Sequence, residues 1–437
     1  MTAIERVRSA IGGATVLLGL GALAQPAHAG GFGVHEQSAT FLGTAFAGAA
    51  AGGDISSMYW NPAAAAAVPG CTAASSYSLI LGSSDETATG GLLAGVPGVD
   101  RSTDVGSDPL VPASYLACQL SDKLFAGVAL NSPFGLLTKP DDLGWAGSPL
   151  AVTSKVFSAN VNPMLAYKLA PGLTVGVGLQ VEYLKIRLNH GSFGSPLLPA
   201  PLIGARSFEA DDWGVGATAG LLWQPLPGTS IGVGYRSAVG FDVEGQFTRG
   251  AAIGSGPAVS TEAEAGLTLP EQVTFSFRQA VGPTWAVLGT VEWKNWSRLG
   301  DVAAVGTGCG PTGVCEVLNL NFRDGWLFSV GAEYAYSPTL LLRGGVAYEI
   351  SPIDDRNRDI LLPDSNRVFL SAGASYKYAE HIILDIGYSH IFFEDADFCI
   401  GSGGGSTHCN PGTTTVLLSG SSDTSVDIVA LGLRYRF

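Results

Sequence analysis

Short segments in which apolar and polar residues alternate follow one another along most of the chain. Alternation with a period of two predicts β-strands, because successive side chains of a strand point to opposite faces. The last segment shows this most clearly, with one apolar face and one small or basic face. Its apolar face is Val429, Leu431, Leu433, Tyr435 and Phe437, and its other face is Ala430, Gly432, Arg434 and Arg436. Since arginine facing hydrocarbon is costly, the basic face is predicted to line the interior of a membrane barrel.

Counting such segments gives about fourteen between residue 70 and the C-terminus. Short turns, such as Pro171-Gly172 and Ser337-Pro338, alternate with longer connections, such as 132–152 and 394–423. An even number of strands brings both ends of a barrel to the same side of the membrane, as in bacterial single-chain barrels. The predicted fold is therefore all-β. It is an antiparallel transmembrane β-barrel of about 14 strands over residues 70–437, with the longer loops extracellular.

Composition favours this class of protein over others. Charged residues are only 14% of the 437 residues and glycines number 60, yet mean hydropathy is positive at +0.28. After the N-terminal leader, no apolar run reaches the roughly 18 residues that a spanning helix needs. The formal net charge of -14 argues against nucleic acid as a partner. Aromatic girdles are expected from tryptophans near predicted strand ends, namely Trp145, Trp213, Trp223, Trp285, Trp293 and Trp296.

Residues 1–29 are predicted to be a signal peptide. Arg6 and Arg8 form a basic start, residues 11–23 are apolar, and Ala27-His28-Ala29 is an A-x-A cleavage site. The apolar run is short for a retained membrane anchor. Export together with a β-barrel places the protein in the bacterial outer membrane.

Six cysteines follow in an exported and therefore oxidising context. Local disulfides are expected where two cysteines bracket a short Gly-rich segment, which pairs Cys309 with Cys315 and Cys399 with Cys409. Elimination then pairs Cys71 with Cys118, near the periplasmic ends of the first two strands. No zinc-type Cys/His spacing occurs in the sequence, so no metal is predicted.

Residues 30–69 lie between the leader and the first strand. The segment is rich in Gly and Ala, has few charges and lacks the alternation of a membrane strand. It is interpreted as a hatch folded inside the barrel, and the alternative is a disordered linker. Its residues resemble the N-terminal hatch of the FadL family of outer-membrane long-chain fatty-acid transporters. The matching positions are Gly31-Phe32, Glu36-Gln37-Ser38, Gly43, Ala47-Gly48, Asp54 and Asn61-Pro62-Ala63.

The resemblance extends through the barrel. Segments that look like family motifs occur in the family's order, although each is weak on its own. They are 131–137 (NSPFGLL), 213–216, 235–237, 269–271, 323–324, 351–352, 356–358, 363–367 and 370–373. The resemblance implies passive uptake of hydrophobic compounds, with long-chain fatty acids favoured and monoaromatic hydrocarbons as the alternative within the same family.

The resemblance also implies a route. In FadL-type proteins a kink in the third strand opens a gap in the wall opposite the hatch motif Asn61-Pro62-Ala63. Here the third strand reaches Asn131, Pro133 and Gly135, and proline and glycine both weaken strand pairing. The alternative is that this stretch only begins an extracellular loop. Phe32, beside Gly31, resembles the residue that inserts into the ligand pocket, and ligand binding is hypothesised to displace this tip and open the exit.

Pocket residues depend on strand phase. If the fifth strand continues without a bulge, Leu184, Ile186 and Leu188 point inward and line an apolar cavity, while Lys185 and Arg187 point out toward lipopolysaccharide phosphates. If a bulge intervenes, Lys185 and Arg187 turn inward and hold a ligand carboxylate. Arg323 is predicted on the interior face, where it resembles a basic residue that meets the fatty-acid head group. Pairing with its neighbour Asp324 is the alternative role.

No catalytic constellation is recognisable, and neither an enzyme activity nor a cofactor is predicted. The expected partners are a hydrophobic small molecule, membrane lipid and lipopolysaccharide, and the protein is expected to be a monomer. Two rival functions belong to other classes. A general porin would have an open, charged constriction and pass small hydrophilic solutes, and a surface adhesin would not affect uptake of apolar compounds.

Overall fold

The computed structural model describes residues 31–67, 70–192, 204–252, 257–355, 357–360, 362–402, 409 and 415–437. The predicted signal peptide and the apolar residues 197–203 of the fifth-to-sixth strand connection lie outside these ranges. No helix of the described residues is both long and apolar enough to cross a membrane.

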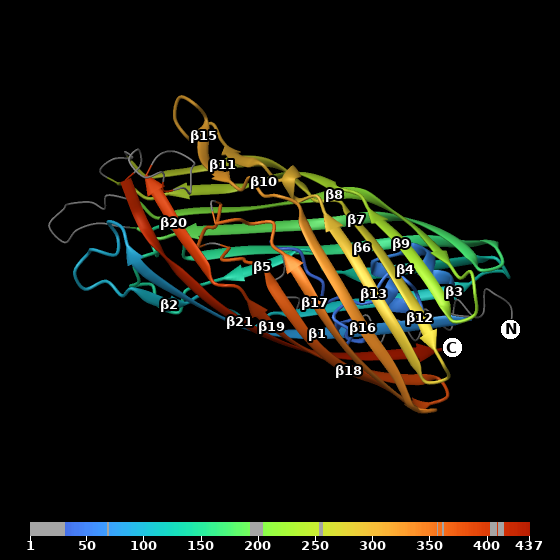
Figure 1. The fold of residues 1–437 in the computed structure, drawn as a ribbon. Helices are drawn as coiled ribbons and strands as arrows, with labels where there is room; N and C mark the ends of the chain where they lie inside the picture. The colour runs from blue at the N-terminus through green and yellow to red at the C-terminus, as the bar shows by residue number, and fades with distance from the viewer. Residues whose placement is uncertain are drawn as a thin grey trace.

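Fourteen antiparallel strands form a closed barrel, as predicted (Figure 1). Several wall strands are interrupted and carry two labels. The wall strands in chain order are β1 (Cys71–Gly90); β2 (Ser102–Asp104) with β3 (Leu110–Gln119); β4 (Leu124–Asn131) with β5 (Gly135–Thr138); β6 (Thr153–Ala170); β7 (Leu173–His190); β8 (Arg206–Trp223); β9 (Thr229–Arg236) with β10 (Val239–Arg249); β11 (Val259–Leu269) with β12 (Gln272–Val281); β13 (Trp285–Lys294) with β14 (Asp301–Val305); β15 (Val314–Asn319) with β16 (Gly325–Ser337); β17 (Leu340–Ile350); β18 (Arg367–Ala379); β19 (Ile382–Phe393) with β20 (Ala396–Ser402); and β21 (Thr415–Arg436).

The first and last wall strands close the barrel. β1 pairs with β21 over nearly its whole length, from Thr72 opposite Arg436 to Gly90 opposite Ser419. Outward residues of the strands are exposed and apolar, as Val177 and Val330 illustrate, while small and polar side chains face the interior. This is the alternation seen in the sequence, and it matches a wall between lipid and a filled lumen.

The tryptophan prediction holds only in part. Trp213, Trp223 and Trp285 are exposed on the outer face of the wall, as girdle residues should be. Trp145 and Trp296 are instead fully buried inside the molecule, so their assignment to a girdle was wrong. Each lies between strands, where alternation gives no information about facing.

Residues 31–67 fill the lumen, and nearly all are buried. They form three short helices, α2 (Ala39–Leu42), η2 (Ile55–Tyr59) and η3 (Pro62–Ala66), which appear as dark blue turns inside the barrel in Figure 1. Each helix begins at a residue suited to its N-cap: the side chains of Ser38, Asp54 and Asn61 accept hydrogen bonds from the first turn. Pro62 at the first position of η3 has the fixed φ that favours this start.

The hatch contacts the wall backbone to backbone. A Cβ atom at Gly232, Gly234 or Gly345 would overlap the carbonyl groups of Ala50, Trp60 and Thr44 respectively. These wall positions therefore have room only for glycine. The many glycines of the sequence serve in part to seat the hatch.

All six cysteines are paired. The disulfides join Cys71 to Cys118, Cys309 to Cys315 and Cys399 to Cys409, which are the pairs expected from the sequence. Cys71 and Cys118 also face each other across the β1–β3 ladder.

Candidate ligand cavity and wall opening

A cavity of about 400 Å³ lies above the hatch in the outer half of the barrel. Its walls are mainly apolar side chains from strand segments far apart in sequence, including Leu136, Val156, Leu188, Leu267 and Leu318. Ligand pockets commonly have volumes of about 300–1,000 Å³ and this kind of lining, and a cavity of about 150 Å³ already holds benzene. The size and lining suit an apolar molecule larger than a single aromatic ring.

Phe32 and Phe322 line this cavity, and both belong to a cluster of four aromatic side chains. Phe32 of the hatch contacts Trp296 at a centroid distance of 4.8 Å and Phe134 at 6.1 Å. Trp296 also contacts Phe134 and Phe322, at 5.9 and 6.1 Å. Phe32 lines the cavity as expected, and the cluster makes its position depend on three wall segments.

The regular pairing of the fifth strand determines which of the predicted pocket residues point inward. β7 continues without a register shift against β8 from Leu173 to His190. Leu184, Ile186 and Leu188 consequently point inward, and Ile186 and Leu188 line the cavity while Leu184 packs in the same apolar cluster.

Lys185 and Arg187 point outward, so the alternative in which they hold a ligand carboxylate is wrong. Both side chains are about half exposed, and they approach Glu209 on β8 at 2.7 and 3.8 Å. The absence of a bulge in β7 is the physical reason, because uninterrupted alternation puts residues next to inward-facing ones on the outer surface.

Arg323 does not reach the cavity either, which corrects its prediction. It is exposed, and its Nε donates a 3.0 Å hydrogen bond to the Ser351 carbonyl. Counting back from the outward Trp326 failed because β16 begins only at Gly325, and the chain before it turns through Asn321, whose φ is +39°. Phe322 faces the cavity instead.

A polar group of side chains lies at another part of the cavity lining. Arg206 Nη1 is 3.0 Å from Glu316 Oε1, and His190 Nε2 is 3.5 Å from the same oxygen. His190 is opposite Arg206 in the β7–β8 register, and Arg206 is opposite Arg249 in the β8–β10 register. The three basic residues thus form one row on the inner face, called here the basic row.

The basic row retains hydrogen-bonding capacity. Nε of Arg206 is buried without a hydrogen-bond partner in the described part of the chain, whereas Nε2 of His190 lies near Glu316. Buried polar atoms normally have partners, and an unmet one costs about 1–3 kcal/mol. Two carboxylates also line the cavity: Glu316 beside the row, and Asp359 from the loop between β17 and β18.

The third wall strand is interrupted where the sequence suggested. β4 ends at Asn131 and β5 begins at Gly135, and both pair with β6, so the chain does not leave the wall as a loop here. Three residues, 132–134, oppose two on β6, because Asn131 faces Asn160 and Gly135 faces Phe157. On the other side the β3–β4 ladder stops at Ser114 and Leu130. β3 therefore makes no ladder pair with residues 132–134.

The hatch tip covers this break from inside. Val34 N donates to Pro133 O and Gly135 N donates to Phe32 O, both at 2.8 Å, so the tip pairs with the broken strand like a short strand. Gln37 Nε2 donates to Ser132 O, also at 2.8 Å. Residues 132–134 are thus held by the hatch rather than by β3.

The Asn61-Pro62-Ala63 motif occupies a different place from the one expected. Asn61 Nδ2 donates to Leu221 O on β8 at 3.0 Å and to Ala50 O within the hatch at 2.8 Å. Gly176 and Gly220 leave room for Pro62 and Ala63 against β7 and β8. The motif anchors the base of the hatch, and the tip residues 32–37 face the strand break.

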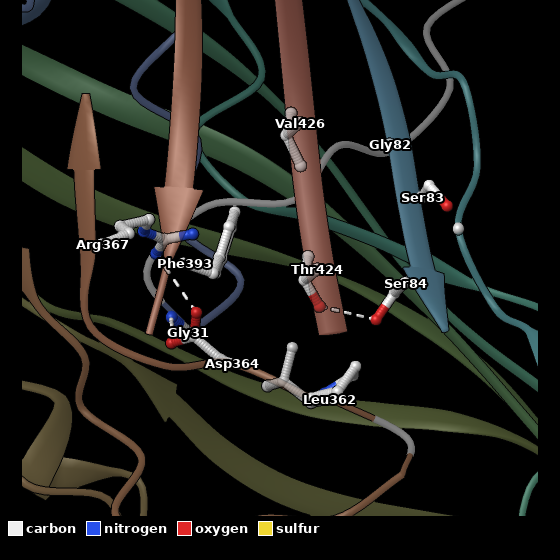
Figure 2. A pocket seen from close by; sticks show the side chains of 12 residues that line it. Gly31, Gly82, Ser83, Ser84, Leu362, Asp364, Arg367, Phe393, Thr424 and Val426 are labelled. Atoms are coloured by element: carbon white, nitrogen blue, oxygen red, sulfur yellow. Dashed lines mark hydrogen bonds and ion pairs between the residues drawn. The ribbon is translucent and has the colours of Figure 1, made fainter. Parts of the chain in front are cut away.

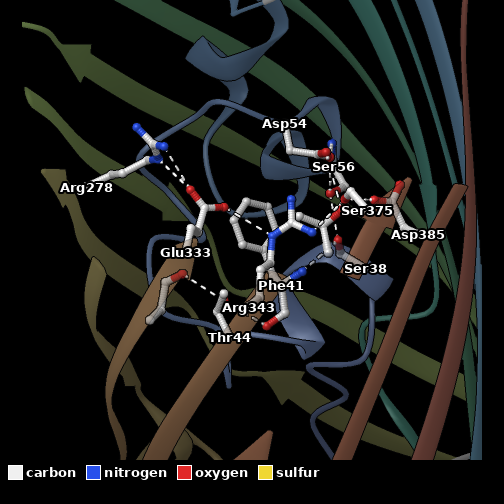
Figure 3. Close-up of polar contacts among 12 residues, drawn as sticks. Ser38, Phe41, Thr44, Asp54, Ser56, Arg278, Glu333, Arg343, Ser375 and Asp385 are labelled. Atoms are coloured by element: carbon white, nitrogen blue, oxygen red, sulfur yellow. Dashed lines mark hydrogen bonds and ion pairs between the residues drawn. The ribbon is translucent and has the colours of Figure 1, made fainter. Parts of the chain in front are cut away.

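Charged groups tie the hatch to the wall as well. Asp54 of the hatch forms an ion pair with Arg434 of β21. Burial raises the pKa of Asp54, but the Arg434 guanidinium and the Ser56 hydrogen bonds outweigh it and hold that pKa below its usual value. Figure 3 shows the Asp54 loop above a wall network in which Arg343 binds Glu333 and Ser375.

A second cavity, beside Gly31, is too small for a ligand. Its volume is about 20 Å³, room for roughly one water. Figure 2 shows how it is closed: Asp364 accepts a hydrogen bond from Gly31 N at 2.9 Å and pairs with Arg367. The same contacts fix the very start of the described hatch.

No cluster of three or more His, Cys, Asp or Glu able to hold a metal occurs among the described residues.

Comparison with known proteins agrees with this architecture. Residues 20–437 match the family described as "Outer membrane protein transport protein (OMPP1/FadL/TodX)". The chain belongs to this family. The FadL-type protein is therefore an outer-membrane protein, like relatives whose names say so.

Two relatives show how far the sequence likeness extends. A long-chain fatty acid transport protein of Escherichia coli is 27% identical over 325 residues, which are 67% of this chain and 72% of the relative. A 47 kDa outer membrane protein of Pasteurella multocida is 26% identical over 394 residues, 85% of this chain and 89% of the relative.

Solved structures share the fold. A Pseudomonas aeruginosa FadL homologue has a TM-score of 0.80 at 20% identity, covering 93% of this chain and all of that one. The Ralstonia pickettii toluene transporter TbuX has a TM-score of 0.67 at 17% identity, covering 92% of this chain and 99% of that one.

Several site residues were missed by sequence reasoning. Trp296 and Phe322 lie between strands and converge only in the folded protein. His190 and Arg206 end and begin neighbouring strands, so their pairing could have been noticed from the hairpin alone. Glu316, on β15, carries no local signal that connects it to them.

Proposed function

We propose that the protein admits hydrophobic compounds passively across the outer membrane, through ligand binding in the cavity, movement of the hatch tip and exit through the break in the third strand. One observation carries this proposal. Phe32 lines the cavity with its ring, while its carbonyl accepts the hydrogen bond from Gly135 at the break. A single residue therefore contacts both the ligand space and the exit.

The proposed sequence of events follows from these contacts. A ligand that fills the inner cavity competes with the Phe32 ring for the surface of Trp296 and Phe134. Displacing the ring withdraws the Phe32 carbonyl from Gly135 and strains the neighbouring bond between Val34 and Pro133. Because β3 makes no ladder contact there, loss of the hatch contacts leaves the break open to the outside of the barrel. The ligand then diffuses laterally, driven by its concentration gradient.

Among hydrophobic compounds we favour long-chain fatty acids, on the strength of the basic row. A cavity lined only by apolar groups suits a hydrocarbon, but here Nε of Arg206 is a buried donor without a hydrogen-bond partner in the described part of the chain. A site built for hydrogen bonding discriminates against analogues that lack the polar group, since its own groups stay unpaired. Relatives are named as fatty acid transporters and structural neighbours as toluene transporters, so both classes must be compared directly.

The test measures binding of hexadecanoate, hexadecanol, toluene and a sugar to full-length protein in lipid nanodiscs. We expect saturable binding of hexadecanoate and weaker binding of hexadecanol. Arg206→Met should weaken hexadecanoate about tenfold to a hundredfold, because hydrogen bonds to charged groups contribute about 1.5–3 kcal/mol. Arg323→Met is the matched control and should have no effect, since the Arg323 side chain is exposed and does not line the cavity.

A second pair of variants distinguishes a loss of ligand binding from misfolding of the protein. Arg206→Met alone leaves Glu316 without its partner, whereas Arg206→Met with Glu316→Gln removes both charges. Glu316→Gln alone should strengthen hexadecanoate binding, because it removes the carboxylate that competes for Arg206. Binding of toluene as tight as hexadecanoate, and insensitive to Arg206, would move the function to a hydrocarbon channel. Sugar conductance without lipid binding would identify a porin.

The same proposal includes the surroundings of the protein. Lys185 and Arg187 lie on the outer face, two and four residues beyond Tyr183, which contacts Trp213 at 5.2 Å in the outward aromatic band. Lipopolysaccharide phosphates would meet these cations at that level. A monomer accounts for the complete barrel, and native mass spectrometry would test both points.

A further inference from the structure

The pairing of the eighth and ninth wall strands is also interrupted. β12 and β13 pair up to Gln272 opposite Lys294, and the next pair outward is a single one, Glu264 of β11 opposite Val305 of β14. Between these pairs, residues 265–270 on one side and 296–304 on the other form no ladder. We call this region the side window. Six residues of strand correspond to about 20 Å along the wall.

The side window lies over a hollow on the outer surface. This outer hollow, of about 460 Å³, is lined by residues of β10, β11 and the 298–302 segment. Three apolar residues line both the outer hollow and the ligand cavity: Leu267, Leu299 and Val302. These three residues therefore border both spaces, and no ladder pair joins the two sides of the window beside them.

The position of the side window relative to the membrane follows from its neighbours. Tyr235, an exposed aromatic residue of β9, hydrogen-bonds Glu271 at 2.9 Å just below the window. Aromatic side chains of this kind mark the membrane–water interface. The outer hollow is also lined by Asp242, Arg298 and Asp301, which are exposed, and Arg298 pairs with Glu271 at 2.9 Å. The window thus opens at the level of the lipid head groups, with an apolar floor and a polar rim.

We infer that the side window is an access route for amphipathic ligands from the head-group level of the outer leaflet into the cavity. A single-chain ligand would pass its tail inward between Leu267, Leu299 and Val302 while its polar end stays at the rim. Rotation of three side chains suffices, since no strand hydrogen bond needs to break. This inference rests on the proposed function, because the side window leads to the same cavity. Ligands would enter at the side window and leave at the third strand.

Glycine substitutions provide a clean way to block the window. A Cβ at Gly300 would have no atom within 4 Å, so a large side chain there projects into open space. Gly250, at the end of β10 and outside the outer hollow, is a matched control whose nearest neighbour to a Cβ is 3.6 Å away. Neither has a positive φ. Gly300→Trp and Gly250→Trp should both fold.

The measurement is the kinetics of hexadecanoate binding to full-length protein in lipid nanodiscs. A blocked route slows entering and leaving alike, so Gly300→Trp should lower the association and dissociation rates about tenfold each and leave Kd unchanged. Gly250→Trp should match the wild type. Unchanged rates in Gly300→Trp would overturn the side window, and so would a changed Kd, because the tryptophan would then act on the cavity itself.

Chemical labelling tests the same point on protein that has already folded. All six native cysteines are in disulfides, so Gly300→Cys introduces a single free thiol. A bulky maleimide attached to it should slow both rates, and the same label on Gly250→Cys should not. Equal rates before and after labelling at both positions would refute the window alone. Failure of the wild type to bind hexadecanoate would refute the proposed function and the window together.

Discussion

Replacing Phe32 by alanine should release the hatch tip from the broken third strand. The Phe32 side chain is 7% exposed, and its ring packs against Trp296 and Phe134. Truncating a buried phenylalanine to alanine costs about 3–5 kcal/mol. Three hydrogen bonds would still hold residues 31–34, through Gly31, through Val34 and from Gly135 to the Phe32 carbonyl.

Each of those hydrogen bonds contributes about 0.5–1.5 kcal/mol net. The lost packing is therefore comparable to the sum of these three hydrogen bonds. Because the cavity beside Phe32 lets neighbours relax, we take the lower value, about 3 kcal/mol. This corresponds to an increase of about a hundredfold in the local opening constant.

Amide hydrogen exchange measured by mass spectrometry on protein in lipid nanodiscs reports this opening directly. Peptides covering 33–37 and 132–135 should exchange about a hundredfold faster in Phe32→Ala than in the wild type, with the rest of the barrel unchanged. Phe322→Ala is the matched control, since it removes a ring from the same cluster but from the wall, without a hydrogen bond to the tip. Equal exchange in Phe32→Ala and wild type, or equal acceleration in both variants, would refute the coupling between cavity and break.

Three further outcomes are expected. Gly220→Val should destabilise docking of the hatch by about 1–3 kcal/mol, because its Cβ would overlap the Asn61 side chain. The hatch should then be cleaved more readily by protease. Gly240→Val is the control and should stay resistant, since a Cβ there has open space. Burial raises the pKa of Glu36. The contribution of Glu36 to folding stability is therefore fullest below the usual carboxyl pKa and declines as pH rises through the raised pKa. Glu36→Gln should abolish that decline in thermal unfolding scans, and an unchanged pH profile in the variant would contradict this role of Glu36. Deleting residues 30–32 should weaken hexadecanoate uptake without altering heat-modifiable barrel assembly, and normal uptake would count against a role for the tip.

The barrel could be predicted because its strands are regular. Where β7 runs on without a bulge, the faces of Leu184, Ile186 and Leu188 follow from counting residues. The number of strands follows in the same way, whereas the local disulfides follow from the short Gly-rich segments between their cysteines. Alternation is a property of the local chain, and one sequence is enough to show it.

Prediction failed where the chain leaves the ladder. Arg323 was assigned by extending an alternation past the start of β16, and the turn at Asn321 reversed the result. Trp296 was placed in a girdle because η4 (Trp296–Arg298) is invisible to a period-two pattern. The cavity gathers its residues from such irregular segments, and their positions depend on tertiary contacts that no local pattern specifies.

The seating of the hatch on wall glycines has a consequence for biogenesis. With backbone touching backbone at Gly232, Gly234 and Gly345, no layer of movable side chains separates hatch from wall. A finished barrel could not admit the hatch afterwards, and the seam between β1 and β21 joins residues at opposite ends of the chain. We expect the wall to fold around a hatch that is already in place, with the pairing between β1 and β21 formed last. The order of synthesis, hatch before wall, would then also be the order of assembly.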